Sequence, residues 1–243
     1  MREERYRHKL KMSSPTVSVI VAARNAERFL AQALNSILSQ TYQPHEIIVV
    51  DGQSTDSTAE IARSCPRVRH VCQNGEGFAD AWNIGIEEAE GELIAILDSD
   101  DLWVAEKLRL QAGYLGLHED IQYTVGKVKF FLEAGCALPR GFKRELLEGE
   151  HVGHMPSNLV ARSSLFREIG AFETGWSIAS DLEWFARARN RRVPMDIIPE
   201  VLLHRRVHDS NLSYCASGSP VFGKEMLKVL KQSIDFQRQQ GQR

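Results

Sequence analysis

Short apolar runs alternate with stretches of helical apolar spacing along the first half of the chain. Runs of β-branched and aliphatic residues predict strands at Val17–Ala22, Ile47–Val50, Val68–Cys72 and Leu93–Leu97. Apolar residues at helical spacing predict helices at Phe29–Leu38, Ser57–Arg63, Phe78–Ala89 and Val104–Leu117. Asn25 is placed to cap the first of these helices. The alternation predicts an α/β fold with a mostly parallel sheet and helices on both faces.

The strict alternation stops after the fourth helix. Further strands are predicted at Ile121–Leu132, Met195–Ile198 and Val201–Val207, and further helices at Asp181–Asn190 and Phe222–Phe236. We predict that the Gly-rich stretch Ala134–Gly153 is a mobile loop. The last helix has one apolar face, on which a second copy of the chain could pack to form a homodimer.

These patterns divide the chain into three parts. Residues 1–14 are rich in Arg, Lys and Glu and predict an N-terminal extension. Residues 15–215 are predicted to form one domain with two halves, 15–117 and 118–215. Residues 216–243 are predicted to form a C-terminal helical tail.

Composition and charge exclude some classes of protein. Acids and bases nearly balance, and the formal net charge of −2 provides no general attraction for nucleic acid. No apolar run approaches the roughly 20 residues that span a bilayer, so no integral membrane segment is expected. The start lacks the apolar core of a secretory signal. We therefore expect a cytoplasmic protein with reduced thiols, although the four cysteines could form two disulfides in a secreted protein: Cys65, Cys72, Cys136 and Cys215.

Polar residues follow each predicted strand of the first half. Ligands of parallel α/β sheets bind beyond the carboxyl ends of the strands, so these residues are the candidates for a site. They are Arg24 and Asn25, Asp51 and Gly52, Asn74–Gly77, and Asp98–Asp101.

The acidic run Asp98-Ser99-Asp100-Asp101 comes directly after an apolar strand. One interpretation is that Asp101 caps the next helix. Three carboxylates repel one another more than a cap requires, however, and a hard divalent cation is the usual compensation. The run therefore favours a Mg²⁺ or Mn²⁺ site completed by substrate phosphates.

A second polar run, from Asp51 to Thr58, follows the second strand. Its simplest interpretation is a turn that caps a helix, a role that Ser54 or Asp56 could fill. Asp51 comes one step earlier, at the strand end, where its oxygens could accept hydrogen bonds from a base or a ribose hydroxyl. We favour a nucleotide contact at Asp51.

Four segments together resemble the family 2 glycosyltransferases of the GT-A fold. They are VSVIVAARNAERFLAQALNSILSQTY, EIIVVDGQSTDST, GFADAWNIGIEEAEGELIAILDSDDLW and AFETGWSIASDLEWFARARNRRVPMDIIPEVLLHRRVHDSNLS. They cover about two thirds of the chain in the family's order. The resemblance implies that residues 15–117 bind a nucleotide-sugar and that residues 118–215 bind the acceptor.

The resemblance also implies roles for particular residues. Asp51 would contact the base, Asp98 would lie towards the ribose, and Asp100 would lie towards a metal. Asp181 would be the catalytic base, and His208 would approach the metal and the diphosphate. The nucleotide-sugar site as a whole is expected to include Ala22, Arg24, Asn25, Asp51, Gly77, Asp80, Asn83, Asp98 and Ser99.

Some positions depart from the family pattern. The residue before Asp181 is Ser180 where the family has Glu, and Asp181 alone could be only a helix cap. Arg24 stands where an aromatic stacking partner is common, although a guanidinium can also stack on a base or bind phosphate. Trp82 is expected to pack in the core, and the signature of processive polymer synthases is absent.

The resemblance implies single transfer of a sugar, with inversion, from a nucleotide-diphospho-sugar. The favoured donor is a UDP-sugar, and the acceptor could be a small natural product, a glycan, a lipid-linked sugar or a peptide. A sugar-phosphate nucleotidyltransferase is the closest alternative enzyme, but its usual Gly-rich phosphate loop is missing because no glycine follows the first strand before Gly52. A non-catalytic sugar-nucleotide or peptide-binding module is the alternative from another class.

Overall fold

A computed structural model describes residues 15–139, 141–211 and 220–241. The predicted extension 1–14 and Cys215 lie outside these residues, as does the predicted boundary between the domain and its tail. In the described part of the chain, no helix is long and apolar enough to cross a bilayer.

The strands form one nine-stranded sheet in the order β3-β2-β1-β4-β8-β6-β9-β5, with β7 beside β6. The first four strands in this order are parallel, whereas β8 runs antiparallel to both β4 and β6. The strand bounds are β1 Val17–Ala23, β2 Glu46–Asp51, β3 Val68–Cys72, β4 Leu93–Asp98, β5 Leu102–Trp103, β6 Tyr123–Leu132, β7 His151–Val152, β8 Val160–Arg162 and β9 Met195–Val207. The predicted α/β class and the parallel first half are confirmed.

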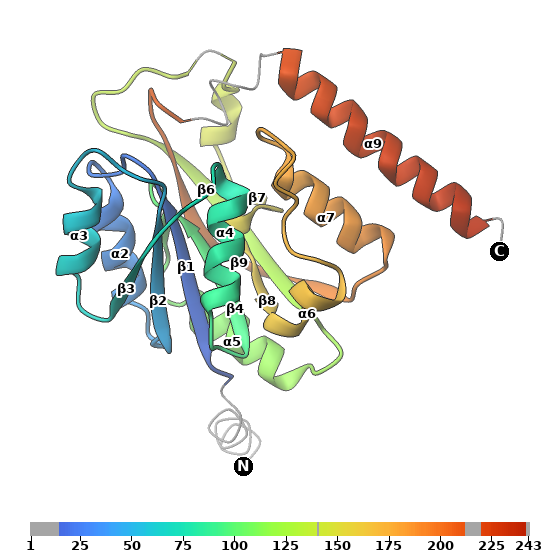
Figure 1. Ribbon diagram of the computed structural model, residues 1–243, viewed down its shortest axis with the longest axis horizontal. Helices are drawn as coiled ribbons and strands as arrows, with labels where there is room; N and C mark the ends of the chain where they lie inside the picture. The colour runs from blue at the N-terminus through green and yellow to red at the C-terminus, as the bar shows by residue number, and fades with distance from the viewer. Residues whose placement is uncertain (1–14, 140, 212–219, 242–243) are drawn as a thin grey trace.

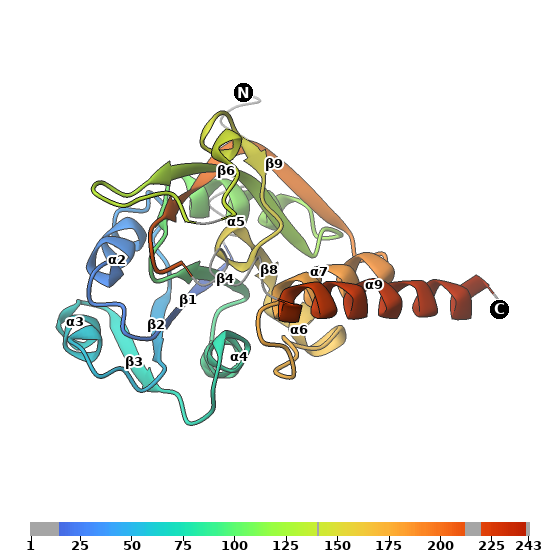
Figure 2. The same ribbon diagram turned by 90° about the horizontal axis from the view of Figure 1, so that it is seen from above.

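Helices cover both faces of the sheet (Figures 1 and 2). Their bounds are α2 Leu30–Leu38, α3 Thr58–Ser64, α4 Phe78–Glu88, α5 Lys107–Leu117, α6 Ser163–Glu168, α7 Ser180–Asn190 and α9 Pro220–Gly241, with 3₁₀ helices η1 Arg144–Leu147 and η2 Pro156–Asn158. Apolar side chains of α2, α3 and α5 share one buried cluster, and those of α4, α6 and α7 share another.

The alternation of side chains along β1 explains the two layers. Val19 and Val21 belong to the cluster with α2 and α5, whereas Ile20 and Ala22 belong to the cluster with α4 and α7. All seven residues of β1 are buried because helices lie on both of its faces. β1 is therefore the centre of the fold, and its carboxyl end fixes the position of the site.

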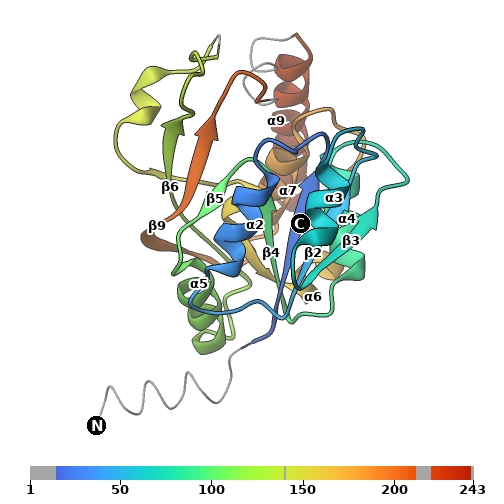
Figure 3. The same ribbon diagram turned by 90° about the vertical axis from the view of Figure 1, so that its left-hand side faces the viewer.

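The second half of the sheet departs from the predicted elements. The two strands predicted at Met195–Ile198 and Val201–Val207 are one strand, β9, which pairs in parallel with β6. The register shifts where Ile197 pairs with Val125 and Val201 pairs with Lys127, which leaves extra residues on β9 around Pro199. A bulge accommodates a residue that has no N–H to donate to the ladder. Figure 3 shows β6 and β9 side by side.

Two predicted helix caps are wrong. Asn25 has a positive φ of 49°, and α2 begins only at Leu30, after the turn that follows Asn25. Asp101 does not cap α5, because β5 lies between them and the N-cap of α5 is Glu106. Neither β5, β7, β8 nor α6 was predicted, because each is too short for its apolar period to be read.

The predicted mobile loop, Ala134–Gly153, contains η1 and most of the hairpin to β7. Leu138, Phe142 and Leu146 from this segment are partly buried and pack against the cluster that contains β1. Its mobility stays a prediction.

Candidate active site

Two carboxylates flank the carboxyl end of β1. Ala23 pairs with Asp51 of β2, and Ala22 pairs with Asp98 of β4. Ala22 itself is buried, so its side chain lies beneath the surface at this edge of the sheet. Parallel pairing thus brings together two residues that are far apart in the sequence, as the strand-end pattern predicted.

Asp51 is buried and held in place at both oxygens. Its Oδ1 accepts a hydrogen bond of 3.0 Å from the N–H of Ser54, and its Oδ2 lies 3.2 Å from Nε2 of His70. His70 comes from β3 and was not predicted from the sequence. A carboxylate accepts more bonds than these two, so Asp51 keeps capacity for a further donor.

The loop after β1 and the loop after β2 are joined by hydrogen bonds. Asn25 Oδ1 accepts from the N–H of Thr55 at 2.9 Å, and the N–H of Asn25 donates to Oγ of Ser54 at 2.8 Å. Asp56 accepts from the N–H of Thr58, the first residue of α3, although the N-cap of that helix is Ser57. Asn25 is therefore a loop organiser, and the neighbouring Arg24 is exposed and available to a ligand.

The predicted residues of α4 have different surroundings. Gly77 is its N-cap with a φ of 85°, a conformation that favours glycine. Asp80 accepts a bond of 2.8 Å from Nε2 of buried Gln73. Both ends of the Asn83 amide bond the backbone of Phe172, at 2.7 and 3.0 Å. Asn83 thus joins α4 to the segment before α7, and Trp82 packs on Phe172 as expected.

The acidic run after β4 holds its carboxylates in unlike environments. Burial and the nearby charge of Asp100 raise the pKa of Asp98 to about 6, against the opposing charge of Arg205. The negative charge of Asp181 contributes to the same rise in pKa. Ser99 is half-buried in the turn between Asp98 and Asp100. Burial, together with the neighbouring carboxylates, therefore disfavours the charged form of Asp98.

Asp101 has a structural role instead of the predicted cap. Its Oδ1 accepts a bond of 2.9 Å from the N–H of Arg206, which ties the turn after β4 to β9. The Arg206 guanidinium is buried, donates to the carbonyl of Asp100 at 2.8 Å, and forms an ion pair with Glu133. Burial raises the pKa of Asp101 well above its usual value.

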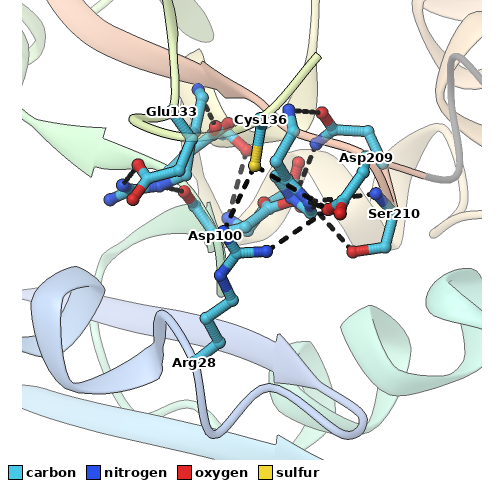
Figure 4. A network of polar contacts seen from close by, with 12 residues as sticks. Arg28, Asp100, Glu133, Cys136, Asp209 and Ser210 are labelled. Carbon is cyan, nitrogen blue, oxygen red and sulfur yellow. Dashed lines mark hydrogen bonds and ion pairs between the residues drawn. The ribbon is translucent and has the colours of Figure 1, made fainter. Parts of the chain in front are cut away.

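Asp100 and His208 meet as the resemblance implied. Nε2 of His208 lies 3.0 Å from Oδ2 of Asp100, and the same oxygen accepts a bond of 3.1 Å from Asn211. His208 is buried, with Phe29 beside its ring and Ser210 at its Nδ1. Figure 4 shows this network, in which Asp100 lies among residues from three distant parts of the chain.

Arg28 and Cys136 extend the same network. Arg28 is within 3.2 Å of both Asp209 Oδ1 and Cys136 Sγ, and all three are drawn in Figure 4. Cys136 belongs to the segment Ala134–Gly153, so this contact ties that segment to the rim of the site. Cys65, Cys72 and Cys136 are not joined in disulfides in the described part of the chain.

The residues present fit a divalent cation that shares its coordination with a substrate. No group of three or more His, Cys, Asp or Glu side chains is arranged to hold a metal within the ranges that the structure describes. Asp100 and His208 offer two ligand atoms, and the charge of Asp100 adds to the effect of burial in raising the pKa of the nearby Asp98. Two protein ligands are what Mg²⁺ uses where phosphates supply the rest.

Asp181 lies in the first turn of α7. The helix begins at Ser180 with Ala179 as its N-cap, so Asp181 is not the cap that the alternative interpretation required. Burial raises the pKa of Asp181, while the N–H of Leu182, at 2.8 Å, and the charge of Arg205 oppose the rise. A carboxyl with a raised pKa, close enough to Asp98 to affect its titration, can take up a proton in the site.

The amino end of α7 is held from outside the helix. Glu225 of α9 accepts bonds from the successive N–H groups of Ser177, Ile178 and Ala179, at 2.7, 3.1 and 3.1 Å. Arg187 of α7 pairs with Glu183 and donates to the carbonyls of residues 169 and 171. These contacts fix the turn that carries Asp181.

Several residues of this site were not predicted from the sequence. Arg205 is the cation that lowers the pKa of Asp98, Asp101 and Asp181. The sequence feature that could have indicated this role is the pair of adjacent arginines shortly before His208. His70, Gln73 and Glu225 carried no pattern, because their roles arise from pairing with distant segments.

Comparisons with known proteins agree with this geometry. The sequence model described as Glycosyl transferase family 2 matches residues 18–141. An uncharacterized glycosyltransferase of Haemophilus influenzae is 37% identical over 124 residues, 49% of each chain. The Escherichia coli protein WfgD, a UDP-Glc:alpha-D-GlcNAc-diphosphoundecaprenol beta-1,3-glucosyltransferase, is 35% identical over 118 residues, 47% of this chain and 46% of WfgD. The chain spans 15% to 49% of the length of the first five such relatives.

The fold also matches solved structures. Residues 1–349 of Staphylococcus aureus TarS, in complex with UDP-GlcNAc, superpose with a TM-score of 0.70 at 21% identity. The match covers 91% of this chain and 66% of that one. A complex of the same TarS fragment with UDP gives a TM-score of 0.63 over 79% of this chain and 60% of that one, at 22% identity. The likeness confirms the GT-A type of fold.

Proposed function

This chain belongs to glycosyl transferase family 2, and we propose that it transfers a sugar from a UDP-sugar to an acceptor nucleophile with inversion, assisted by Mn²⁺ or Mg²⁺. The observation that carries the proposal is the convergence of three groups at one sheet edge. They are buried Asp51, the Asp100–His208 pair, and Asp181 within electrostatic range of Asp98. A base contact, a diphosphate contact and a proton acceptor are what direct displacement at an anomeric carbon requires.

The donor is proposed from the comparisons and the surroundings of Asp51. TarS was solved with UDP and with UDP-GlcNAc, and WfgD is named for UDP-Glc. Asp51 retains capacity to accept a bond from the base, and exposed Arg24 could stack on it or bind phosphate. These features support a uridine nucleotide.

Asp100 and His208 would hold the metal, whose positive charge would offset the charge that develops on the diphosphate. Asp98, with its raised pKa, would lie towards the ribose, where a hydroxyl could donate to it. The charge of Arg205 opposes protonation of these carboxylates, because it lowers the pKa of Asp98, Asp101 and Asp181 against the effect of burial.

Asp181 acts as the general base in the proposed step. It takes the proton of an acceptor hydroxyl while that oxygen forms a bond to the anomeric carbon. The bond between the anomeric carbon and the diphosphate oxygen breaks, and the electron pair leaves with the nucleoside diphosphate. Attack opposite the leaving group inverts the anomeric configuration.

Product analysis tests the proposal. The purified chain is incubated with a set of UDP-sugars, a divalent metal and candidate acceptors, and the released phosphorus compound and product anomer are identified. We take a lipid-linked sugar as the first acceptor because WfgD is named for one. Release of UDP with an inverted product is expected. Release of pyrophosphate would instead favour the sugar-phosphate nucleotidyltransferase, and a retained anomer would exclude single displacement.

A further inference from the structure

Helix α9 has an inner face that is attached to the rest of the molecule. Val229 and Ser233 are buried against α7, and Oγ of Ser233 accepts a bond of 3.0 Å from Asn190. Glu225 bonds the backbone before α7, and Nζ of Lys228 lies 4.0 Å from the ring centroid of Trp176. Figure 2 shows α9 beside α7, with its carboxyl end extending past the body of the molecule.

The outer side of α9 carries an exposed apolar stripe formed by Leu227, Leu230 and Ile234. Their exposed fractions are 68%, 51% and 48%. Spacings of three and four residues put them on one side of the helix. Four of the eight large hydrophobic side chains that are exposed in the described part of the chain belong to α9, although α9 is only one of its helices.

A row of basic residues runs beside this apolar stripe. Lys224, Lys231 and Arg238 are exposed and recur every seven residues, which places them on one side of the helix. Leu227 lies between Lys224 and Lys231 in this arrangement, and Ile234 lies between Lys231 and Arg238. The two carboxylates of α9 do not cancel this charge. Glu225 turns inward to the backbone before α7, and only Asp235 remains on the outside.

We propose that this outer side of α9 docks on the surface of a membrane that contains anionic lipid. A helix with an apolar side and a basic side lies in the interface, with its apolar residues inserted among the acyl chains. Basic residues near such a surface add attraction to anionic headgroups. The apolar stripe and the basic row are adjacent along the same helix, as this mode of binding requires.

A second copy of the chain fits the apolar stripe less well. Two helices could pair through apolar residues that alternate at spacings of three and four. On α9 this pattern runs from Leu227 to Ile234 and ends at the next position, where the residue is the polar Gln237. A coiled coil needs this pattern to continue over about three or four heptads. Three side chains also bury far less than the roughly 800 Å² per partner of a stable interface. Three basic residues in one row would moreover repel their counterparts in a close pair.

The inference does not depend on the proposed sugar transfer, and it is tested by vesicle sedimentation of the full chain. One set of vesicles is phosphatidylcholine alone, and the other also contains phosphatidylglycerol. The stripe variant is Leu227→Asp with Leu230→Asp, and the charge variant is Lys224→Gln with Lys231→Gln. Val221→Asp is the matched control, because Val221 is 47% exposed on the same helix but on a different side from the stripe.

The wild type is expected to sediment with the anionic vesicles and to be released by high salt. The stripe variant should lose about tenfold or more of its partitioning. Each lysine removed should lower it by roughly fivefold. The control, which adds one carboxylate to the same helix, should lose no more than the roughly fivefold that a single charge contributes. Unchanged thermal melting and unchanged UDP binding show that a variant is folded, whatever the transfer activity proves to be.

Two results would overturn this inference. One is equal sedimentation of wild type and stripe variant with anionic vesicles, which includes the case of no sedimentation by either. The other is a wild-type dimer in light scattering that Leu227→Asp with Leu230→Asp disrupts while vesicles bind neither protein. That outcome would assign the apolar stripe to a second copy of the chain.

Discussion

Asp98 shows how a single residue of the site affects the stability of the whole chain. Its pKa is about 6 in the folded protein and 3.8 in its ordinary state, so between these pH values the folded chain binds more protons than the unfolded chain. Stability of the ligand-free protein should therefore fall as pH rises through this window.

Replacement of Asp98 by Asn should remove this loss of stability at higher pH. We expect Asp98→Asn to raise the free energy of unfolding at pH 7 by on the order of 1–3 kcal/mol, with a much smaller gain near pH 4. Urea unfolding of the ligand-free protein at both pH values measures the effect, and Glu76→Gln, at an exposed carboxylate, is the control. Equal gains at pH 4 and pH 7 would show that charge on Asp98 is not the cause.

Asp100 is the residue on which the proposed metal depends most. Asp100→Ala removes a ligand atom and the partner of His208, but its side chain is 30% exposed and fills no core position. We expect the variant to fold and to lose the part of its UDP affinity that requires Mn²⁺. Calorimetric titration of UDP with and without Mn²⁺ measures that part. A folded variant that keeps the full metal-dependent affinity would remove Asp100 from the site.

Single residues could be predicted from the sequence where a motif fixes their position. Asp51, Asp98 and Asp100 follow strands whose apolar runs are unambiguous, and the structure puts them at one edge. The caps predicted for Asn25 and Asp101 were wrong because a cap depends on where the helix begins. One extra turn after β1 and a two-residue strand after β4 move both helices away.

Helix α9 affects the site through another element, the amino end of α7. Its Glu225 accepts three backbone N–H bonds just before the turn that carries Asp181. In Glu225→Gln, one of the two carboxylate oxygens becomes an NH₂ group, which cannot accept such bonds.

We therefore expect Glu225→Gln to lower stability by about 1–3 kcal/mol and to leave UDP affinity unchanged. A displaced base should slow single-turnover transfer by about tenfold to a hundredfold. Asp235→Asn, on the same helix, is the control. An unaltered transfer rate in a measurably destabilised Glu225→Gln would limit Glu225 to a structural role.

The segment from residue 134 to residue 153 has little regular structure for its length. Its described residues hold one 3₁₀ helix and one two-residue strand, and its Glu150 forms a surface ion pair with Lys127 of β6. We expect its amides to exchange quickly in the free protein and more slowly with UDP and Mn²⁺, as in segments that close over a site. Hydrogen exchange measures this. Strong protection without ligand would show that the segment is rigid throughout.

Several elements were predicted almost to the residue, whereas α5 begins three residues later than predicted and α9 extends five residues beyond its predicted end. β3 has the predicted bounds, and α4 and α7 differ by one residue at one end. β9 was predicted as two strands because Pro199 interrupts a strand pattern. The sequence alone does not reveal that the register between β9 and β6 shifts at this point, which accommodates the proline in a bulge. Whether a short strand such as β8 forms is determined by the strands that pair with it and not by its own residues.

At the scale of the molecule, the order of the strands decides which residues meet. The βα alternation was enough to predict a parallel first half of the sheet, but it did not predict that β4 pairs with β1 and not with β3. It could not predict that β8 joins β4 to β6, or that β9 returns beside β6. That second half brings Arg205, His208 and Asp181 to the acidic run. The family resemblance implied roles for His208 and Asp181, which the apolar pattern did not, whereas Arg205 was not predicted.

The central claim is that these distant segments form one catalytic site with Asp181 as its base. Asp181→Asn keeps the shape of the side chain and its bond to the N–H of Leu182, but the amide cannot take up a proton. The measurement is the rate of sugar transfer in a single turnover, for wild type and Asp181→Asn, with saturating UDP-sugar, metal and acceptor. We predict undiminished donor binding and a rate lower by about two to four orders of magnitude. A near-normal rate in the folded variant would contradict the account.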